Sequence, residues 1–451
     1  MPAAVSNPVL ESAVRRASRR LMPMIVVLYV VSFLDRTNVS FAERALELDR
    51  GISAAAYAFG AGVFFIGYAI FEIPSNLALR RFGAKAWLAR IAITWGIVSA
   101  CFAFVQGETS FIVLRFLLGV AEAGLFPGII MYLAEWFPNA HRVRMFAIFY
   151  LAQPFSQMIG SPLSGVLISL GDSVDGIAGW QLMFAVEGGL AVVAGIVAIF
   201  ALVNSPQQAT FLSEQEKGAL RQAMAEEDDL RSADGPGGVW AAMRNGRVWY
   251  FTVVYFCLQI AVYGVTFNLP TQVAGLTGRD VGWQVGLITA VPWFVGMFAC
   301  YFVGRHATTV RRRRTWGTWL FVSTGVFVIG SAAAGASGYA LVGIVCISVA
   351  VASFLSIGPI TWSYPTAFLT GAAAAAGIGL INSLGNLGGF VAPNLREFVA
   401  SSTGSDALGV AALGVLPFLA AVMMWGTKRF RLRADRLLVD VRDGADERTR
   451  G

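Results

Sequence analysis

Runs of apolar residues alternate along this chain with short clusters of charged residues. A helix needs about 20 apolar residues to cross a hydrocarbon core roughly 30 Å thick, and many of these runs reach that length. Charged residues make up only 14% of the 451 residues, whereas a soluble domain carries about 25%. The chain has too few charged side chains to cover a water-facing surface, so we predict an all-α integral membrane protein.

The apolar runs predict about twelve transmembrane helices in two six-helix bundles. The predicted spans are 21–42, 56–78, 86–106, 110–134, 142–169, 180–203, 248–273, 283–304, 315–335, 339–362, 372–400 and 406–427. The predicted domains are an N-terminal segment (1–20), a first bundle (21–203), a linker (204–247), a second bundle (248–427) and a basic tail (428–451). Two bundles joined by a central linker are typical of transporters built from repeats.

Within the linker, Ser213 is followed three residues later by Glu216. This spacing is the capping-box pattern, in which the two side chains bond each other's backbone N–H groups at the start of a helix. It predicts a short amphipathic helix inside the linker.

The basic residues predict the orientation of the chain. The net charge is +7, and basic residues of membrane proteins gather in cytoplasmic loops. Most of the 34 Lys and Arg residues lie in segments on one side of the predicted spans, and the opposite loops hold only Arg44, Arg50, Arg279 and Arg396. We therefore predict cytoplasmic termini and a multi-pass protein of a bacterial inner membrane. The charge sets topology and indicates no nucleic-acid partner.

Four ionisable residues lie deep in two predicted spans, where charge is costly and is a candidate for function. They are Asp35 and Arg36 in span 21–42, and Arg115 and Glu122 in span 110–134. At 1.5 Å per residue, Asp35 lies roughly 21 Å from the inner end of its span and Arg115 about 8 Å from the outer end of its own, which are similar depths. Glu122 is two turns beyond Arg115 on the same helix face, near the midplane. We expect the four to face one cavity.

Their chemistry predicts a division of roles. A guanidinium group binds a carboxylate with two parallel hydrogen bonds, so Arg36 and Arg115 are predicted to bind an anionic substrate. A desolvated carboxylate accepts a proton readily, so Asp35 and Glu122 are predicted to couple protons to transport. The alternative is that Asp35–Arg115 and Arg36–Glu122 are structural pairs that neutralise each other.

Uncharged polar side chains in the spans are further candidates for substrate binding. They are Tyr68, Gln153, Trp362, Asn382 and Asn386. Their alternative role is hydrogen bonding between helices, which is worth only about 0.6 kcal/mol on average in membranes. Glu187, near the outer part of span 180–203, is interpreted as an interfacial or structural acid.

No cofactor, metal or catalytic site is expected. The two histidines, His141 and His306, fall in predicted inside loops, so no zinc set is available. No P-loop pattern appears, which argues against direct coupling to ATP. We therefore predict that the protein is not an enzyme.

Four segments carry a resemblance to a known family: 29–42, which contains Ser-Phe-Leu-Asp-Arg-Thr-Asn, 115–128, Trp-Ser-Tyr-Pro-Thr at 362–366, and 381–390. Over about residues 20–430 the chain resembles the major facilitator superfamily, in its anion:cation symporter branch. The segment 73–76 looks most like the tartrate, phthalate and hydroxyphenylacetate permeases.

The resemblance implies import of a small carboxylate driven by protons, by a protein acting as a monomer. It assigns proton coupling and anion binding to the positions of Asp35, Arg36, Arg115 and Glu122. It also places Tyr68, Gln153, Trp362 and Asn382 at positions that line the cavity of sugar-acid carriers.

Other functions stay open at this point. An exchanger or exporter of organic anions would use the same residues, because gradients fix the direction of transport. A membrane sensor that binds without transporting would need a signalling domain, for which 204–247 is too short.

Overall fold

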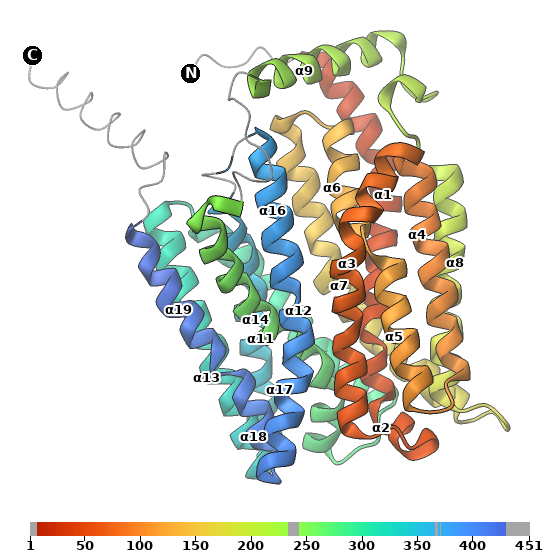
Figure 1. Ribbon diagram of the computed structural model, residues 1–451, viewed down its shortest axis with the longest axis vertical. Helices are drawn as coiled ribbons and strands as arrows, with labels where there is room; N and C mark the ends of the chain where they lie inside the picture. Colours follow the sequence, from red (N-terminus) through yellow and green to blue (C-terminus); the bar gives the residue numbers. More distant parts are fainter. Residues whose placement is uncertain (1–6, 233–242, 366–368, 370, 430–451) are drawn as a thin grey trace, which may run out of the picture. The chain divides into compact units, whose positions relative to one another are not determined.

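The computed structural model describes residues 7–232, 243–365, 369 and 371–429 (Figure 1). The described residues form helices and no strand. Ten helical segments among them are long and apolar enough to cross a membrane, judged by length and composition. The predicted all-α membrane class is confirmed.

Each predicted span falls on one helix or on consecutive helices, although several of the predicted ends differ. In the first part of the chain they are α1 (Pro8–Thr37), α2 (Val39–Arg50), α3 (Ala54–Phe82), α4 (Ala84–Cys101), η1 (Phe102–Phe104), α5 (Glu108–Glu122), α6 (Leu125–Trp136), α7 (Asn139–Gly171), α8 (Gly179–Ala201), η2 (Pro206–Gln208) and α9 (Glu214–Ser232). In the second part they are α11 (Gly246–Thr277), α12 (Trp283–His306), α13 (Val310–Ala336), α14 (Ala340–Trp362), α16 (Gly371–Asn386), α17 (Gly388–Thr403), α18 (Asp406–Leu413), α19 (Leu416–Gly426) and η3 (Thr427–Arg429).

Two predicted spans, 142–169 and 372–400, are helical but are not among the ten apolar segments. In the first, α7 carries Gln153 and Gln157 together with several serines, which lower its hydropathy. The second is divided at Leu387 into α16 and α17, each of only 16 residues. Several polar side chains of these segments are buried within the fold, among them Ser156, Gln157 and Asn382.

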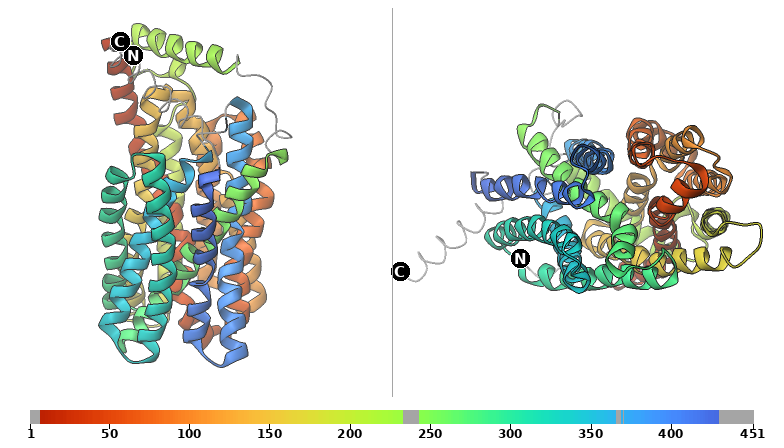
Figure 2. Two further views of the ribbon diagram at one scale, coloured as in Figure 1. Left: turned by 90° about the vertical axis from the view of Figure 1, so that its left-hand side faces the viewer. Right: turned by 90° about the horizontal axis from the view of Figure 1, so that it is seen from below.

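The chain forms two compact units, which are described separately: Met1–Ala233 with Thr266–Phe294, and Asp234–Val265 with Val295–Gly451. Within each unit the long helices run side by side (Figure 2). The predicted domain boundaries stay a prediction, and most of the predicted tail, 430–451, lies outside the described residues.

Glycines allow close helix packing in the first unit. A Cβ atom on Gly188 of α8 would meet the backbone of Gly96 and Ala100 in α4, and one on Gly119 of α5 would meet the carbonyl group of Phe64 in α3. Small residues at such contacts let helix backbones approach each other, which is how membrane helices gain packing energy. The α3–α5 contact fixes the register of the helices that carry the candidate site.

The linker helix α9 lies across the end of the first unit, over the start of α1 (Figure 1). The predicted capping box is present: the Ser213 N–H donates to Glu216 Oε2 at 2.9 Å, and the Glu216 N–H donates to Ser213 Oγ at 3.3 Å. Ser12 of α1 donates to Glu216 at 2.8 Å, and Arg16 lies 3.4 Å from it. Burial opposes ionisation of Glu216, but these hydrogen bonds and the Arg16 charge hold its pKa below the ordinary value.

Candidate functional site

Arg36 and Glu122 form a buried ion pair between α1 and α5. Glu122 is 0% exposed and Arg36 is 8% exposed. Three aromatic rings surround the guanidinium group, with centroids at 4.9 Å (Phe33), 5.1 Å (Phe64) and 5.5 Å (Tyr68). Arginine is suited to such a place because its planar cation pairs with a carboxylate and stacks on ring faces. Tyr68, a predicted lining residue, is thereby placed beside the pair.

Asp35 is held by α4 and not by an arginine. The indole N–H of Trp95 donates to one of its oxygens at 2.9 Å, and the Ser99 hydroxyl donates to the other at 2.5 Å. Asp35 is 1% exposed, and its carboxyl group forms no ion pair with a described residue. Two strong donors can hold this carboxylate without a cation nearby.

Arg115 is directed at the backbone of α3. Its Nε donates to the Gly60 carbonyl at 3.3 Å, a terminal nitrogen donates to the Ala61 carbonyl at 3.1 Å, and it lies 5.2 Å from the Phe64 ring. The alternative pairing of Asp35 with Arg115 is therefore wrong, whereas that of Arg36 with Glu122 is present. The difference arises because α4 supplies donors to Asp35, which satisfies the acid without Arg115.

Glu122 is the last residue of α5, at a break between α5 and α6. Gly124 has a φ of +88°, a left-handed conformation that favours glycine. A Cβ atom there would collide with the Ser75 hydroxyl of α3. One Glu122 oxygen bonds Arg36, and the other has no hydrogen-bond partner among the described residues. The predicted single span 110–134 is thus two helices, and its acid lies at the joint.

Gln153 lies half-buried in α7, one turn before Gln157. Gln157 accepts a hydrogen bond from Thr37 of α1 at 3.1 Å, and Ser156 donates to the Val30 carbonyl of α1 at 2.6 Å. Sequence analysis did not select Gln157, although its spacing of four residues from Gln153 places both on one helix face. The polar face of α7 is thus directed at α1, the helix that carries Asp35 and Arg36.

The other three predicted lining residues belong to the second unit. The Trp362 ring meets the Tyr255 ring of α11 edge to face at 4.9 Å, and Asn386 accepts a hydrogen bond from Gln259 of α11 at 2.7 Å. Asn382 is 5% exposed. The predicted site residues therefore form two groups, one in each unit, and α11 contributes Tyr255 and Gln259, which sequence analysis missed.

Glu187 is a buried acid of α8. It is 0% exposed in α8, and the Ser164 hydroxyl of α7 donates to its Oε1 at 2.7 Å. The sequence interpretation, an interfacial or structural acid, rested on its place near the outer part of the predicted span 180–203. The structure covers it with α1, α4 and α7.

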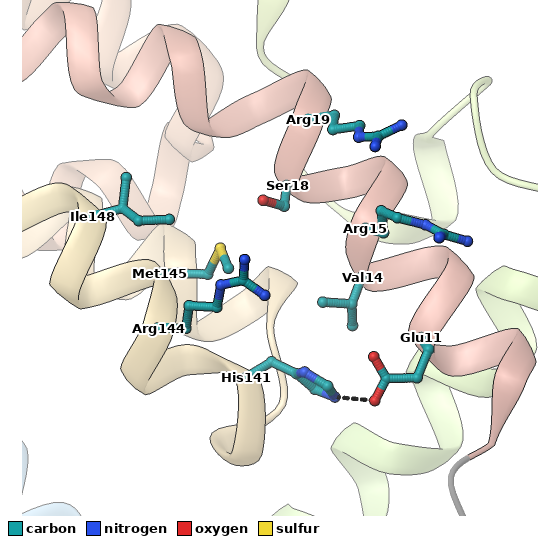
Figure 3. A pocket seen from close by; sticks show the side chains of 9 residues that line it. All are labelled: Glu11, Val14, Arg15, Ser18, Arg19, His141, Arg144, Met145 and Ile148. Carbon is teal, nitrogen blue, oxygen red and sulfur yellow. Dashed lines mark ion pairs between the residues drawn. The ribbon is translucent and has the colours of Figure 1, made fainter.

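A cavity of about 380 Å³ lies between the first turns of α1 and α7 (Figure 3). Its lining residues are Glu11, Val14, Arg15, Ser18, Arg19, His141, Arg144, Met145 and Ile148. The facing side chains of Glu11 and His141 lie 3.6 Å apart across it. None of the predicted site residues lines this cavity, so it is separate from the candidate site.

Comparisons with known proteins agree with this architecture. The family described as Major Facilitator Superfamily matches residues 25–393. The inner membrane transport protein RhmT of Escherichia coli K12 is 38% identical, covering 96% of this chain and 98% of its own. A putative tartrate transporter of Agrobacterium vitis is 42% identical, covering 92% of this chain and 95% of its own. The E. coli xylose transporter XylE, in a partially occluded inward-open conformation, has a TM-score of 0.72 at 16% identity, covering 94% of this chain and 99% of its own.

Proposed function

Because the chain belongs to the Major Facilitator Superfamily of membrane transporters, we propose that it is a secondary transporter that imports a small organic anion together with protons. The substrate is a carboxylate, such as a hydroxy-dicarboxylate, a sugar acid or an aromatic acid. Arg36 and Arg115 bind the anion, and Asp35 and Glu122 bind the coupling protons. The protein acts as a monomer in a bacterial inner membrane, with both termini in the cytoplasm.

The buried ion pair between Arg36 and Glu122 is the observation that carries this proposal. A buried charge pair is held together because breaking it leaves an uncompensated charge. A carboxylate substrate can replace Glu122 as the partner of Arg36, provided that Glu122 takes up a proton as it is released. Binding of the anion and binding of the proton then favour each other, which is the requirement for symport.

Arg115 supports the choice of an anionic substrate. Its guanidinium group is buried at 1% exposure and bonds only neutral carbonyl groups. It therefore contributes a buried positive charge that forms no ion pair with a carboxylate side chain of the described residues. Among the relatives, two are named as putative tartrate transporters, and tartrate is a small dicarboxylate of this kind.

The test is uptake by the purified protein in liposomes. Tartrate, monocarboxylic sugar acids, hydroxyphenylacetate and the neutral sugar xylose are supplied outside, while a pH electrode records the external medium. We expect at least one carboxylate to accumulate under an inward proton gradient and to make the medium more alkaline as it enters. Accumulation of xylose alone would contradict the choice of anion.

The same liposomes separate the alternatives. Exchange of labelled for unlabelled carboxylate without accumulation would identify an exchanger. Release of carboxylate from the interior of the liposomes against an outward proton gradient would identify an exporter. Saturable binding of a carboxylate without any flux would identify a sensor.

A further inference from the structure

We infer that Glu187 is a third proton-binding carboxylate, which exchanges its proton during transport; this inference rests on the proposed function. It lies outside the pair Asp35 and Glu122, on a helix that carries none of the predicted site residues.

The surroundings of Glu187 contain too little to hold a charge. Its Oε1 accepts one hydrogen bond, from Ser164, and its Oε2 has no partner among the described residues. No Lys or Arg of the described chain forms an ion pair with it. A charged carboxylate without a counter-charge is costly to bury in such a site, so this acid is suited to carrying a proton.

The helices packed on α8 place the charged groups nearest to Glu187. On α1, Asp35 lies close enough for the two carboxylates to repel each other, and Asn38 contacts both, donating to Asp35 at 3.4 Å. On α4, a Cβ atom at the neighbouring Gly188 would meet the backbone of Ala100, so this side presents backbone and no charge.

The remaining charged groups lie toward the start of α8. Asp49 of α2 accepts a hydrogen bond from the Trp180 indole at 2.8 Å, and Arg50 lies over the Trp180 ring. Asp172 of α7 accepts one from the Gly179 N–H at 2.8 Å. These groups are satisfied about two turns away, so Asp35 is the acid that interacts with Glu187.

Asp35 and Glu187 therefore titrate as a coupled pair. Asp35 accepts short hydrogen bonds from Trp95 and Ser99, which stabilise its charged form, whereas Glu187 accepts one short hydrogen bond, from Ser164, and shares the contact of Asn38 with Asp35. When Asp35 is charged, repulsion keeps the proton on Glu187. When Asp35 takes up a proton from the outside during the transport cycle, the repulsion ends and Glu187 can release its own proton to the inside. The proton on Asp35 then passes to Glu187 and restores the starting state, so the pair carries one proton inward in each cycle.

A permanently protonated structural acid is the competing role, and Glu187→Gln separates the two. Glutamine has the shape and hydrogen-bonding capacity of the protonated acid but cannot titrate. Labelled uptake of the carboxylate and proton uptake are measured in the same liposomes, over a range of pH. We expect about one proton fewer per substrate and the loss of one step in the pH profile. Glu47→Gln, at an exposed acid of α2, is the matched control and should leave both unchanged.

Wild-type stoichiometry and pH profile in Glu187→Gln would overturn the inference. If this variant fails to fold, Glu187→Asp keeps a titratable group one methylene shorter, and we expect it to shift the pH midpoint; an unshifted midpoint would overturn the inference equally. Absence of proton flux in the wild type would instead refute the proposed symport, so the two failures are distinct.

Discussion

Replacement of Arg36 by lysine tests whether this residue binds the substrate. Lysine keeps the positive charge, so Glu122 retains an ionic partner and the fold is preserved. Lysine lacks the planar fork that bonds a carboxylate at two points. The loss of one charge-assisted hydrogen bond is worth about 1.5–3 kcal/mol, and every 1.4 kcal/mol is tenfold in affinity. We therefore expect KM for the carboxylate to rise roughly tenfold to hundredfold.

The assay is initial-rate uptake in liposomes at constant pH, with the amount of inserted protein measured for each variant. Arg44→Lys is the matched control, because Arg44 forms an exposed pair with Glu47 at 2.6 Å, and exposed pairs contribute little. Its KM should equal that of the wild type. Wild-type KM in Arg36→Lys would show that Arg36 binds no substrate and serves only to neutralise Glu122.

Three further predictions concern packing, the linker helix and the second unit. Gly119→Ala should lower the melting temperature in detergent, since overpacking costs about 1–3 kcal/mol. Gly189→Ala is the control and should not lower it, because a Cβ atom at Gly189 meets no atom within 4 Å. Equal melting temperatures of the two variants would contradict the close α3–α5 contact. The lowered pKa of Glu216 means that its stabilisation of the α9–α1 contact is fully present above the ordinary pKa of 4.5 and is lost as the pH falls through the lowered pKa. Spin-label distances between α9 and α1 should therefore lengthen only in acid in the wild type, and already at pH 7 in Glu216→Gln. Alanine at Gln259 and at Asn386 should have non-additive effects on stability, with a coupling of about 0.6 kcal/mol, and full additivity would refute their hydrogen bond.

The spans could be predicted because the bilayer demands long apolar helices whatever their neighbours. The pairing of Arg36 with Glu122 was one of the alternatives that the sequence offered, because both charges lie deep in their spans. The partners of Asp35 could not be predicted, because Trp95 and Ser99 come from α4, whose rotation is set by packing against α8. Such contacts between helices depend on side-chain shape and leave no periodic signal in one sequence.

One local feature, the break after Glu122, had a usable sequence signal that depth alone did not reveal. Gly124, directly after Glu122, favours a helix break, and Pro127 follows it in the first turn of α6. The burial of Glu187 depends on which neighbours cover α8, so its position along the helix indicated only an interfacial or structural acid. The contacts of α8 with its neighbouring helices, which only the structure shows, reveal that Glu187 is buried.

Glu122→Gln gives the most direct measurement of proton coupling, which is the central claim. The amide mimics the protonated acid permanently, so Arg36 loses its carboxylate partner and can pair with the substrate, and no proton can be exchanged at this position. Counterflow and proton-driven accumulation of the same labelled carboxylate are measured in one batch of liposomes. We expect Glu122→Gln to retain counterflow and to lose accumulation. Accumulation equal to the wild type would place proton coupling elsewhere, and loss of counterflow as well would mean that Glu122 is structural or binds the substrate itself.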